Sequence, residues 1–249
     1  MLMPITDQDR KTFQIEGVVF LPCVFDKDWI QSLKEGVRKN LASPSNRMRI
    51  WDRSEKDKIT LYDSDNWRRI EEYQNFVYES PSKEIACSLL KTSKVNFFFD
   101  AIFVRSTGVR FPTPWHQDEP YWTVEGMDTV SFWMPLGPVE KRSSLSFVPG
   151  SHRWLNHFQQ KDFGELNPDK QTSIDTVSFQ GQWEPFPDID SDLEKYKVVS
   201  WDMTPGDCVA FNNGDKVAAA TTSCSSAIHS RGSLRSFRLC SHFRASTSV

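Results

Sequence analysis

The second half of the chain consists of short runs of aromatic and β-branched residues separated by glycine and proline turns. Runs of strand length occur at residues 95–104, 129–136, 145–148 and 208–211. They are rich in the residue types that pack well on a pleated sheet. Short strands and turns of this kind, behind a helical N-terminal region, predict an antiparallel jelly roll packed against helices.

Helices are predicted ahead of these strands. Asp26 can cap a helix whose apolar residues recur at helical spacing. Two further helices are expected, over residues 67–78 and from Ser80-Pro81 onward, since proline is tolerated at the first helical position. A strand over residues 13–24 is expected to come before them all.

The predicted organisation is a single domain over residues 1–249, mainly β with flanking helices. Helical support is expected over about residues 26–92, and the jelly-roll core over about residues 95–245. A final strand is expected within residues 234–243. The polar or pattern-poor stretches are predicted to be loops: residues 44–66, for which a lid over a pocket is the alternative, 153–195 and 212–227.

Composition argues against several kinds of partner. The net charge of -3 and the pI near 6.0 give no basic field, so neither nucleic acid nor an anionic membrane surface is expected to bind. No apolar run approaches the ~20 residues of a membrane span, and we find no signal peptide. The five cysteines are scattered and form no CxxC, which predicts free thiols in a reducing compartment. A cytoplasmic protein is therefore expected.

The stretch over residues 113–122 carries the residues with the clearest chemistry. His116 and Asp118 are two residues apart, so in an extended strand they point to the same face. One imidazole and one carboxylate are two-thirds of the 2-His-1-carboxylate facial triad that holds non-heme Fe(II). A His-x-Asp pair also occurs by chance at polar strand edges, so the flanking sequence has to decide.

Six stretches of the chain match, in order, motifs of one protein family. They are residues 16–22, 103–108, 113–122, 131–136, 146–152 and 205–212. Over about residues 10–212 the chain therefore resembles the phytanoyl-CoA dioxygenase family of Fe(II)- and 2-oxoglutarate-dependent oxygenases. The resemblance implies a double-stranded β-helix of the cupin-like kind, with Fe(II) as the metal and 2-oxoglutarate and O2 as cosubstrates.

The resemblance also implies roles for four residues. His116 and Asp118 are expected to be iron ligands, while Arg105 and Trp133 are expected near the 2-oxoglutarate pocket. Relatives usually carry a lysine at the position of Arg105. Related halogenases have a small residue in place of the carboxylate ligand, which admits halide. Because Asp118 is present here, hydroxylation-type chemistry on a small organic metabolite is expected.

The third iron ligand is the part of the family pattern that this sequence does not repeat. In relatives a second histidine follows the Gly-Asp turn by about ten residues, and counting from Asp207 reaches Val217. The next histidine along the chain is His229. Either a loop inserted before the strand makes His229 the ligand, at little cost in closure entropy, or the C-terminal segment has diverged and the iron site is incomplete.

The remaining histidines are weaker candidates. His152 follows Pro-Gly-Ser and is expected to close a turn, and His157 lies in a polar stretch and is expected to be solvated. His242 is a further candidate for the third ligand. His229 is preferred because it precedes two arginines, and a guanidinium can bind the distal carboxylate of 2-oxoglutarate through two hydrogen bonds.

Arg238 is the expected 2-oxoglutarate anchor, and Arg235 is the alternative on the opposite strand face. Two functions follow from the two interpretations of the iron site. The first is a dioxygenase that oxidises an unactivated C–H bond and releases succinate and CO2. The second is a jelly-roll binding module that has lost the distal iron ligand. Aromatic residues that could line the substrate entrance are Trp51, Trp67, Tyr121 and Trp122.

Overall fold

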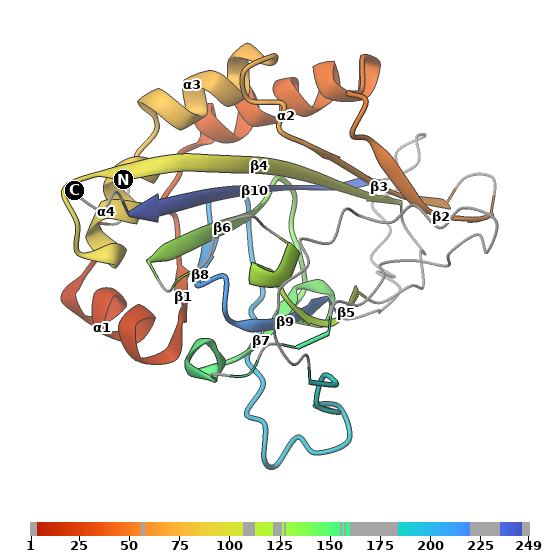
Figure 1. Ribbon diagram of the computed structural model, residues 1–249. Helices are drawn as coiled ribbons and strands as arrows, with labels where there is room; N and C mark the ends of the chain where they lie inside the picture. The colour runs from red at the N-terminus through yellow and green to blue at the C-terminus, as the bar shows by residue number, and fades with distance from the viewer. Residues whose placement is uncertain are drawn as a thin grey trace.

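The computed structural model describes residues 4–55, 58–106, 113–121, 126, 128–154, 156, 158–159, 184–219 and 235–245. Two antiparallel sheets lie one above the other, and helices cover the outer face of the larger sheet (Figure 1). This arrangement confirms the jelly roll with flanking helices. That residues 1–249 form a single domain stays a prediction.

The described residues include four α-helices: α1 (Asp7–Glu16), α2 (Lys27–Ala42), α3 (Glu71–Glu79) and α4 (Ser82–Leu90). The predicted cap of α2 is confirmed, because the Asp26 carboxylate accepts hydrogen bonds from the backbone N–H groups of Asp28 at 3.1 Å and Trp29 at 3.0 Å. Helix α3 begins four residues later than expected. None of the helices among the described residues is long and apolar enough to cross a membrane.

Helix α1 corrects the prediction of a strand over residues 13–24. Thr6 Oγ1 accepts a hydrogen bond from the Asp9 N–H, and the Asp9 carboxylate accepts one from the Thr6 N–H, so a capping box starts a helix here. Gly17 ends the helix in the left-handed conformation, at a φ of 76°. Only β1 (Val18–Leu21) remains of the expected strand.

The larger sheet has seven strands in the order β1-β8-β6-β10-β4-β3-β2. Besides β1 they are β2 (Arg49–Glu55), β3 (Lys58–Ser64), β4 (Val95–Ser106), β6 (Thr129–Pro135), β8 (Cys208–Phe211) and β10 (Arg235–Ala245). The last four confirm predicted strands. Strands β2 and β3 correct the loop expected over residues 44–66, since β3 pairs with β4 from Thr60 to Ser64 and β2 adds the edge strand.

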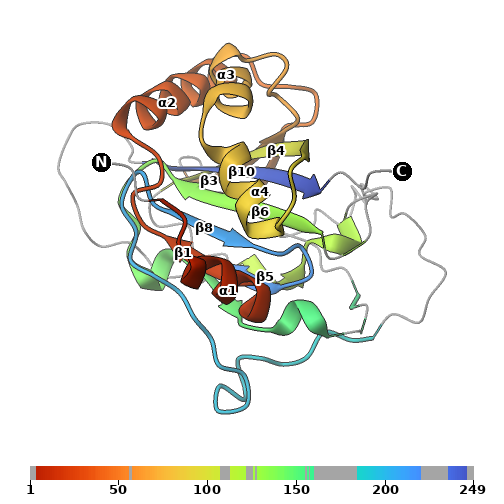
Figure 2. The same cartoon turned by 90° about the vertical axis from the view of Figure 1, so that its left-hand side faces the viewer.

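The smaller sheet has the order β5-β9-β7, and its strands are β5 (Thr113–Gln117), β7 (Leu145–Val148) and β9 (Lys216–Ala219). Strand β9 lies inside the loop expected over residues 212–227 and corrects it. Short 3-10 helices follow or precede these strands: η1 (Glu119–Tyr121), η2 (Lys141–Ser143) and η3 (Ser151–Arg153). Figure 2 shows the smaller sheet packed below the larger one, with α1 beside β1.

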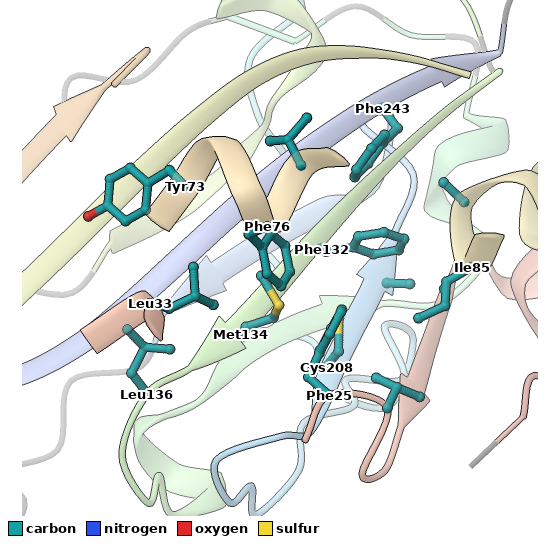
Figure 3. Packing of buried hydrophobic residues seen from close by; sticks show 14 of the residues in the cluster. Phe25, Leu33, Tyr73, Phe76, Ile85, Phe132, Met134, Leu136, Cys208 and Phe243 are labelled. Carbon is teal, nitrogen blue, oxygen red and sulfur yellow. The ribbon is translucent and has the colours of Figure 1, made fainter. Parts of the chain in front are cut away.

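One hydrophobic cluster joins the helices to the outer face of the larger sheet. Leu33 of α2 and Phe76 of α3 pack in it with Phe132 and Met134 of β6 (Figure 3). Trp67 is also part of this cluster and only 8% exposed. Of the two roles that the sequence leaves open for Trp67, core packing and a place at a substrate entrance, the structure shows core packing.

A second cluster fills the space between the two sheets. Trp133 and Phe211 reach it from the larger sheet, and Phe147 and Val217 from the smaller one. Because both faces of β6 are covered, all seven of its residues are buried. We call this space the interior of the roll. It is where inward-facing polar side chains would have to do chemistry.

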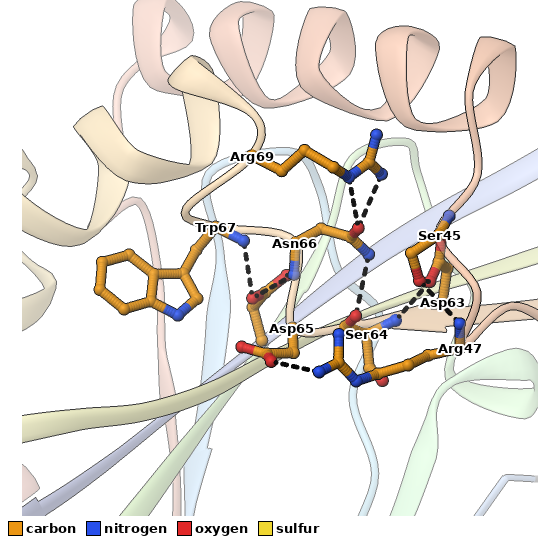
Figure 4. A network of polar contacts seen from close by, with 9 residues as sticks. Ser45, Arg47, Asp63, Ser64, Asp65, Asn66, Trp67 and Arg69 are labelled. Carbon is orange, nitrogen blue, oxygen red and sulfur yellow. Dashed lines mark hydrogen bonds and ion pairs between the residues drawn. The ribbon is translucent and has the colours of Figure 1, made fainter.

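A buried polar network ties the helical layer to β3 and β4 (Figure 4). The Asp100 carboxylate accepts hydrogen bonds from the backbone N–H groups of Asn66 and Trp67, each at 3.0 Å. The Asp63 carboxylate accepts from the Asn40 side chain at 2.7 Å and the Ser45 N–H at 2.8 Å. These contacts fix the turn after β3 and the end of α2 against the sheet.

Candidate active site

His116 lies near the end of β5 and faces the interior of the roll. In the smaller sheet it is paired directly with Val217 of β9, whose side chain belongs to the interior cluster. Residues directly opposite each other on antiparallel strands point to the same face of the sheet. Trp115, one residue earlier, points the other way and packs in a third cluster on the outer face, where its Nε1–H donates to Asp190 at 2.9 Å.

The tautomer of His116 is set by its own strand. Its Nδ1 lies 2.8 Å from the carbonyl oxygen of Pro114. A carbonyl only accepts hydrogen bonds, so Nδ1 must carry the proton, and the Nε2 lone pair of the neutral ring is left for another partner. Nε2 points at Asp118 Oδ1, 3.2 Å away, and the two side chains are 11% and 19% exposed.

This pair fits a metal ion. The imidazole nitrogen and the carboxylate oxygen are both metal-ligand atoms, and a metal cation between them would accept an electron pair from each. Metal–ligand bonds of about 2.1 Å at right angles place neighbouring ligand atoms about 3 Å apart, close to the observed 3.2 Å between His116 and Asp118. Among the residues that the structure describes, no group of three or more His, Cys, Asp and Glu side chains could hold a metal. The described donors are therefore two.

The turn after β5 is held in place from two sides. The backbone N–H of Glu119 donates to the Asn213 carbonyl at 3.1 Å, which joins the turn to the segment just before β9. The Glu119 carboxylate accepts from the Gln117 side chain at 2.9 Å. The ring of Tyr121 meets the His116 ring edge-on, with centroids 6.2 Å apart. Of the aromatic residues expected at a substrate entrance, Tyr121 thus does lie beside His116.

Arg105 and Trp133 come from two strands of the larger sheet. Ala101 and Phe103 of β4 pack in or against the interior cluster, and Arg105, two residues on, shares their face. Trp133 of β6 lies in the same cluster and is 2% exposed. The structure thus brings both residues to the interior of the roll, on the sheet opposite β5 and β9.

Arg238 and Arg235 lie on β10, of which the backbone is described here. Arg238 is paired with Phe103, and Arg235 with Ser106. Pairing with Phe103 puts position 238 in register with the row of residues that borders the interior. Position 235 is three residues away from position 238 and therefore belongs to the opposite face of the strand.

Several expected site residues lie outside the described part of the chain. They are His229, His157 and Trp122, together with the side chains of Trp51, Arg235, Arg238 and His242. The role of His229 as third ligand stays a prediction.

His152 is described, and it does more than close a turn. It is 9% exposed, its backbone N–H donates to Asp215 at 3.1 Å, and its Nδ1 lies 3.3 Å from the same carboxylate oxygen. Lys216, which follows Asp215 in the chain, is fully buried, and its ammonium group donates to the carbonyls of Gly214 at 2.7 Å and Ser151 at 3.2 Å. Burial raises the pKa of Asp215 and lowers the pKa of Lys216 to about 8. The sequence signal for this cluster, an Asp-Lys pair ahead of an apolar run, is too common to be read in advance.

The comparisons with known proteins concern the family and the fold. The family model described as "Phytanoyl-CoA dioxygenase (PhyH)" matches residues 13–214. No curated protein matches the chain by sequence.

Solved structures share the fold. The non-heme alpha ketoglutarate dependent carbocyclase SnoK from nogalamycin biosynthesis has a TM-score of 0.72 at 17% identity, over 97% of this chain and 84% of that one. EctD from S. alaskensis has a TM-score of 0.70 at 14% identity, over 97% and 77%. The epimerase SnoN has a TM-score of 0.68 at 13% identity, over 96% and 83%. At such identities the likeness shows the fold alone.

Proposed function

Because the chain belongs to the phytanoyl-CoA dioxygenase family, we propose that it binds iron through His116 and Asp118 and oxidises a C–H bond of a small organic metabolite. The family is one of Fe(II)/2-oxoglutarate-dependent dioxygenases, and the chain is an enzyme of this class with Fe(II) as metal and 2-oxoglutarate as cosubstrate. Together the metal and 2-oxoglutarate activate O2 for oxidation of the substrate, with release of succinate and CO2.

The observation that carries the metal assignment is the pair of donor atoms at the end of β5 and in the turn after it. His116 Nε2 and Asp118 Oδ1 converge at 3.2 Å on the interior side of the smaller sheet. The Pro114 carbonyl orients the imidazole from behind, as an outer partner of a metal-binding histidine commonly does. His116 is in β5 and Asp118 is the first residue after it, so their relative position depends on local backbone geometry.

The cosubstrate carboxylate would be bound from the opposite sheet. Arg105 of β4 borders the interior on the face shared with Ala101 and Phe103, and Arg238 is at the register position opposite Phe103. We assign the distal carboxylate of 2-oxoglutarate to Arg238, with Arg235 as the alternative, and place Arg105 near the same pocket. The indole of Trp133 would supply an apolar wall that keeps water out.

The substrate class is supported by the ligands seen in neighbouring structures. EctD is solved with 2-oxoglutarate and 5-hydroxyectoine, and SnoN with Fe3+, alpha ketoglutarate and nogalamycin RO. The fold thus accommodates small organic molecules beside the cosubstrate. The charge of -3 over the chain supports a partner list without nucleic acid or anionic membranes.

Anaerobic titration with Fe(II) and 2-oxoglutarate tests the assignment. The wild type is expected to give a weak visible charge-transfer band and, on admission of O2, to form succinate. His116→Ala and Asp118→Asn are expected to abolish both signals. The matched control is Asp190→Asn, which alters a carboxylate that contacts β5 from its outer face. A band that survives both site variants would refute the assignment, as would an equal loss in the control.

A further inference from the structure

We propose that Val217 occupies the position on β9 from which a third protein ligand would complete the metal centre of His116 and Asp118, and that this coordination position is thereby left to water or a small exogenous ligand. The inference rests on the proposed function, since it presumes a metal at these two residues. It differs from the expectation that His229 fills the position.

The pairing of β5 with β9 is the first support. His116 and Val217 are directly opposite in the register of the smaller sheet. Such pairs have Cβ atoms about 4.5–5.5 Å apart and side chains on the same face. Two imidazoles placed this way can reach one metal ion, so position 217 is the neighbouring-strand position from which a second histidine would bind.

The register of β9 is fixed at its start, by the two residues before Val217. Just before the strand, the buried Asp215 carboxylate accepts from the backbone N–H groups of His152 at 3.1 Å and Asn212 at 3.2 Å. Lys216 donates its backbone N–H to Ser151 Oγ at 2.8 Å and has its buried ammonium on the outer side of the sheet. A slip of one residue would turn every side chain of the strand over. The slip would bring the Lys216 ammonium group into the interior and away from the Ser151 carbonyl, which accepts a hydrogen bond from it. Val217 therefore faces inward.

Valine at this place cannot bind a metal. Its side chain is 2% exposed and packs in the interior cluster, opposite Phe147 of β7 on one side and His116 of β5 on the other. Within the described part of the chain no third His, Cys, Asp or Glu joins the pair. The family match also ends at residue 214, so the matched region includes both ligands on β5 but stops short of β9.

The two protein ligands found among the described residues would hold a metal weakly and leave more coordination positions open than a facial triad does. Water, or a small anion or imidazole in the medium, would take the position beside Val217. The inference therefore concerns the affinity and the ligand set of the metal centre. It leaves the two donor atoms on β5 in their proposed roles.

Metal affinity measured with Co(II) and Fe(II) under anaerobic conditions tests the proposal without relying on turnover. Val217→His is expected to tighten binding by about tenfold or more, because loss of a mere outer partner of a ligand already changes affinity by about 10–100-fold. Val217→Thr, which keeps the shape and adds a hydroxyl, is the matched control and is expected to bind like the wild type. Equal affinity in Val217→His and Val217→Thr would overturn the proposal, because the position would then already be filled from elsewhere.

Val217→Cys gives an independent spectroscopic test in case the larger histidine disturbs folding. Its thiolate is expected to add a near-ultraviolet charge-transfer band on Co(II) binding, which the wild type and Val217→Thr lack. The band should vanish when His116→Ala is added. Absence of the band in a folded, Co(II)-binding Val217→Cys protein would show that position 217 does not face the metal. If neither the wild type nor any Val217 variant binds metal through His116, the proposed function itself fails, and that result is distinct from the other two.

Discussion

The carboxyl group of Asp100 provides a quantitative test of the polar network behind the roll. Asp100 is 2% exposed on β4, and burial raises its pKa from 3.8 to about 6, although the N–H groups of Trp67 and Asn66 oppose the shift. Between about pH 4 and pH 6 the folded state therefore binds more protons than the unfolded state, so the free energy of unfolding falls as the pH rises. Asp100→Asn removes this titration and keeps the shape of the side chain.

The size of the effect follows from the two pKa values. A difference of about two pH units corresponds to about 3 kcal/mol. The stabilisation linked to Asp100 is present below pH 4 and lost above pH 6. The stability of the wild type minus that of Asp100→Asn is therefore expected to fall by about 3 kcal/mol from pH 4 to pH 7.

Urea unfolding of both proteins at intervals from pH 4 to pH 7.5 measures this difference. Asp63→Asn is the matched control, and its difference from the wild type is expected to change little over this pH range. Burial opposes ionisation of Asp63 too, but hydrogen bonds from Ser45 and Asn40 outweigh it and hold its pKa below 3.8. The stabilisation from Asp63 is therefore present above pH 4 and lost as the pH falls through the folded pKa. If the Asp100→Asn difference stayed flat or grew with pH, the two N–H donors would outweigh burial, and the reasoning would be refuted.

Two further substitutions probe the buried cluster next to β9. Gly17→Ala is expected to lower the free energy of unfolding by about 2 kcal/mol or more, because φ is 76° and the added Cβ would lie 2.3 Å from His152 Nδ1. Gly137→Ala, with open space around it, is the control and should change stability by less than about 0.5 kcal/mol in the same urea assay. Lys216→Met is expected to cost about 2 kcal/mol, since two buried carbonyls lose a charged donor, while the exposed Lys195→Met should leave the unfolding midpoint unchanged.

The parts of the fold that the sequence predicts well are those with strong local signals. Asp26 caps α2, and the apolar runs at β4, β6, β7 and β8 become strands. Strands β6 and β8 are buried along their whole length, so they show no polar alternation. The missed elements are polar. Strands β2 and β3 form because β3 pairs with β4 and β2 pairs with β3. This is a tertiary interaction that the sequence of residues 44–66 does not indicate. Helix α1 depends on the Thr6–Asp9 capping box, a signal that is present in the sequence.

The candidate site also has one part that the sequence predicts and another that it does not. His116 and Asp118 stand out in the sequence as a His-x-Asp pair, and the ordered motifs around them distinguish this pair from a chance match. A partner on a neighbouring strand depends on register, which the sequence does not state. Counting ten residues from Asp207 reaches Val217, and the structure pairs this residue with His116. Residues 220–234, which include His229, lie between β9 and β10 and outside the described part of the chain, so the role of His229 stays a prediction.

The choice of valine at position 217 has an energetic consequence that metal binding should reverse. In the metal-free protein the buried valine contributes about 1.5 kcal/mol of apolar burial, whereas an imidazole there would lose hydration without a partner. Val217→His should therefore unfold at a lower temperature than the wild type in the presence of EDTA. With excess Co(II), tenfold tighter binding adds about 1.4 kcal/mol of stabilisation, so the order of the two midpoints should narrow or invert. Midpoints that shift in parallel for both proteins on adding Co(II) would mean that the histidine does not reach the metal, and that β9 faces His116 without sharing its chemistry.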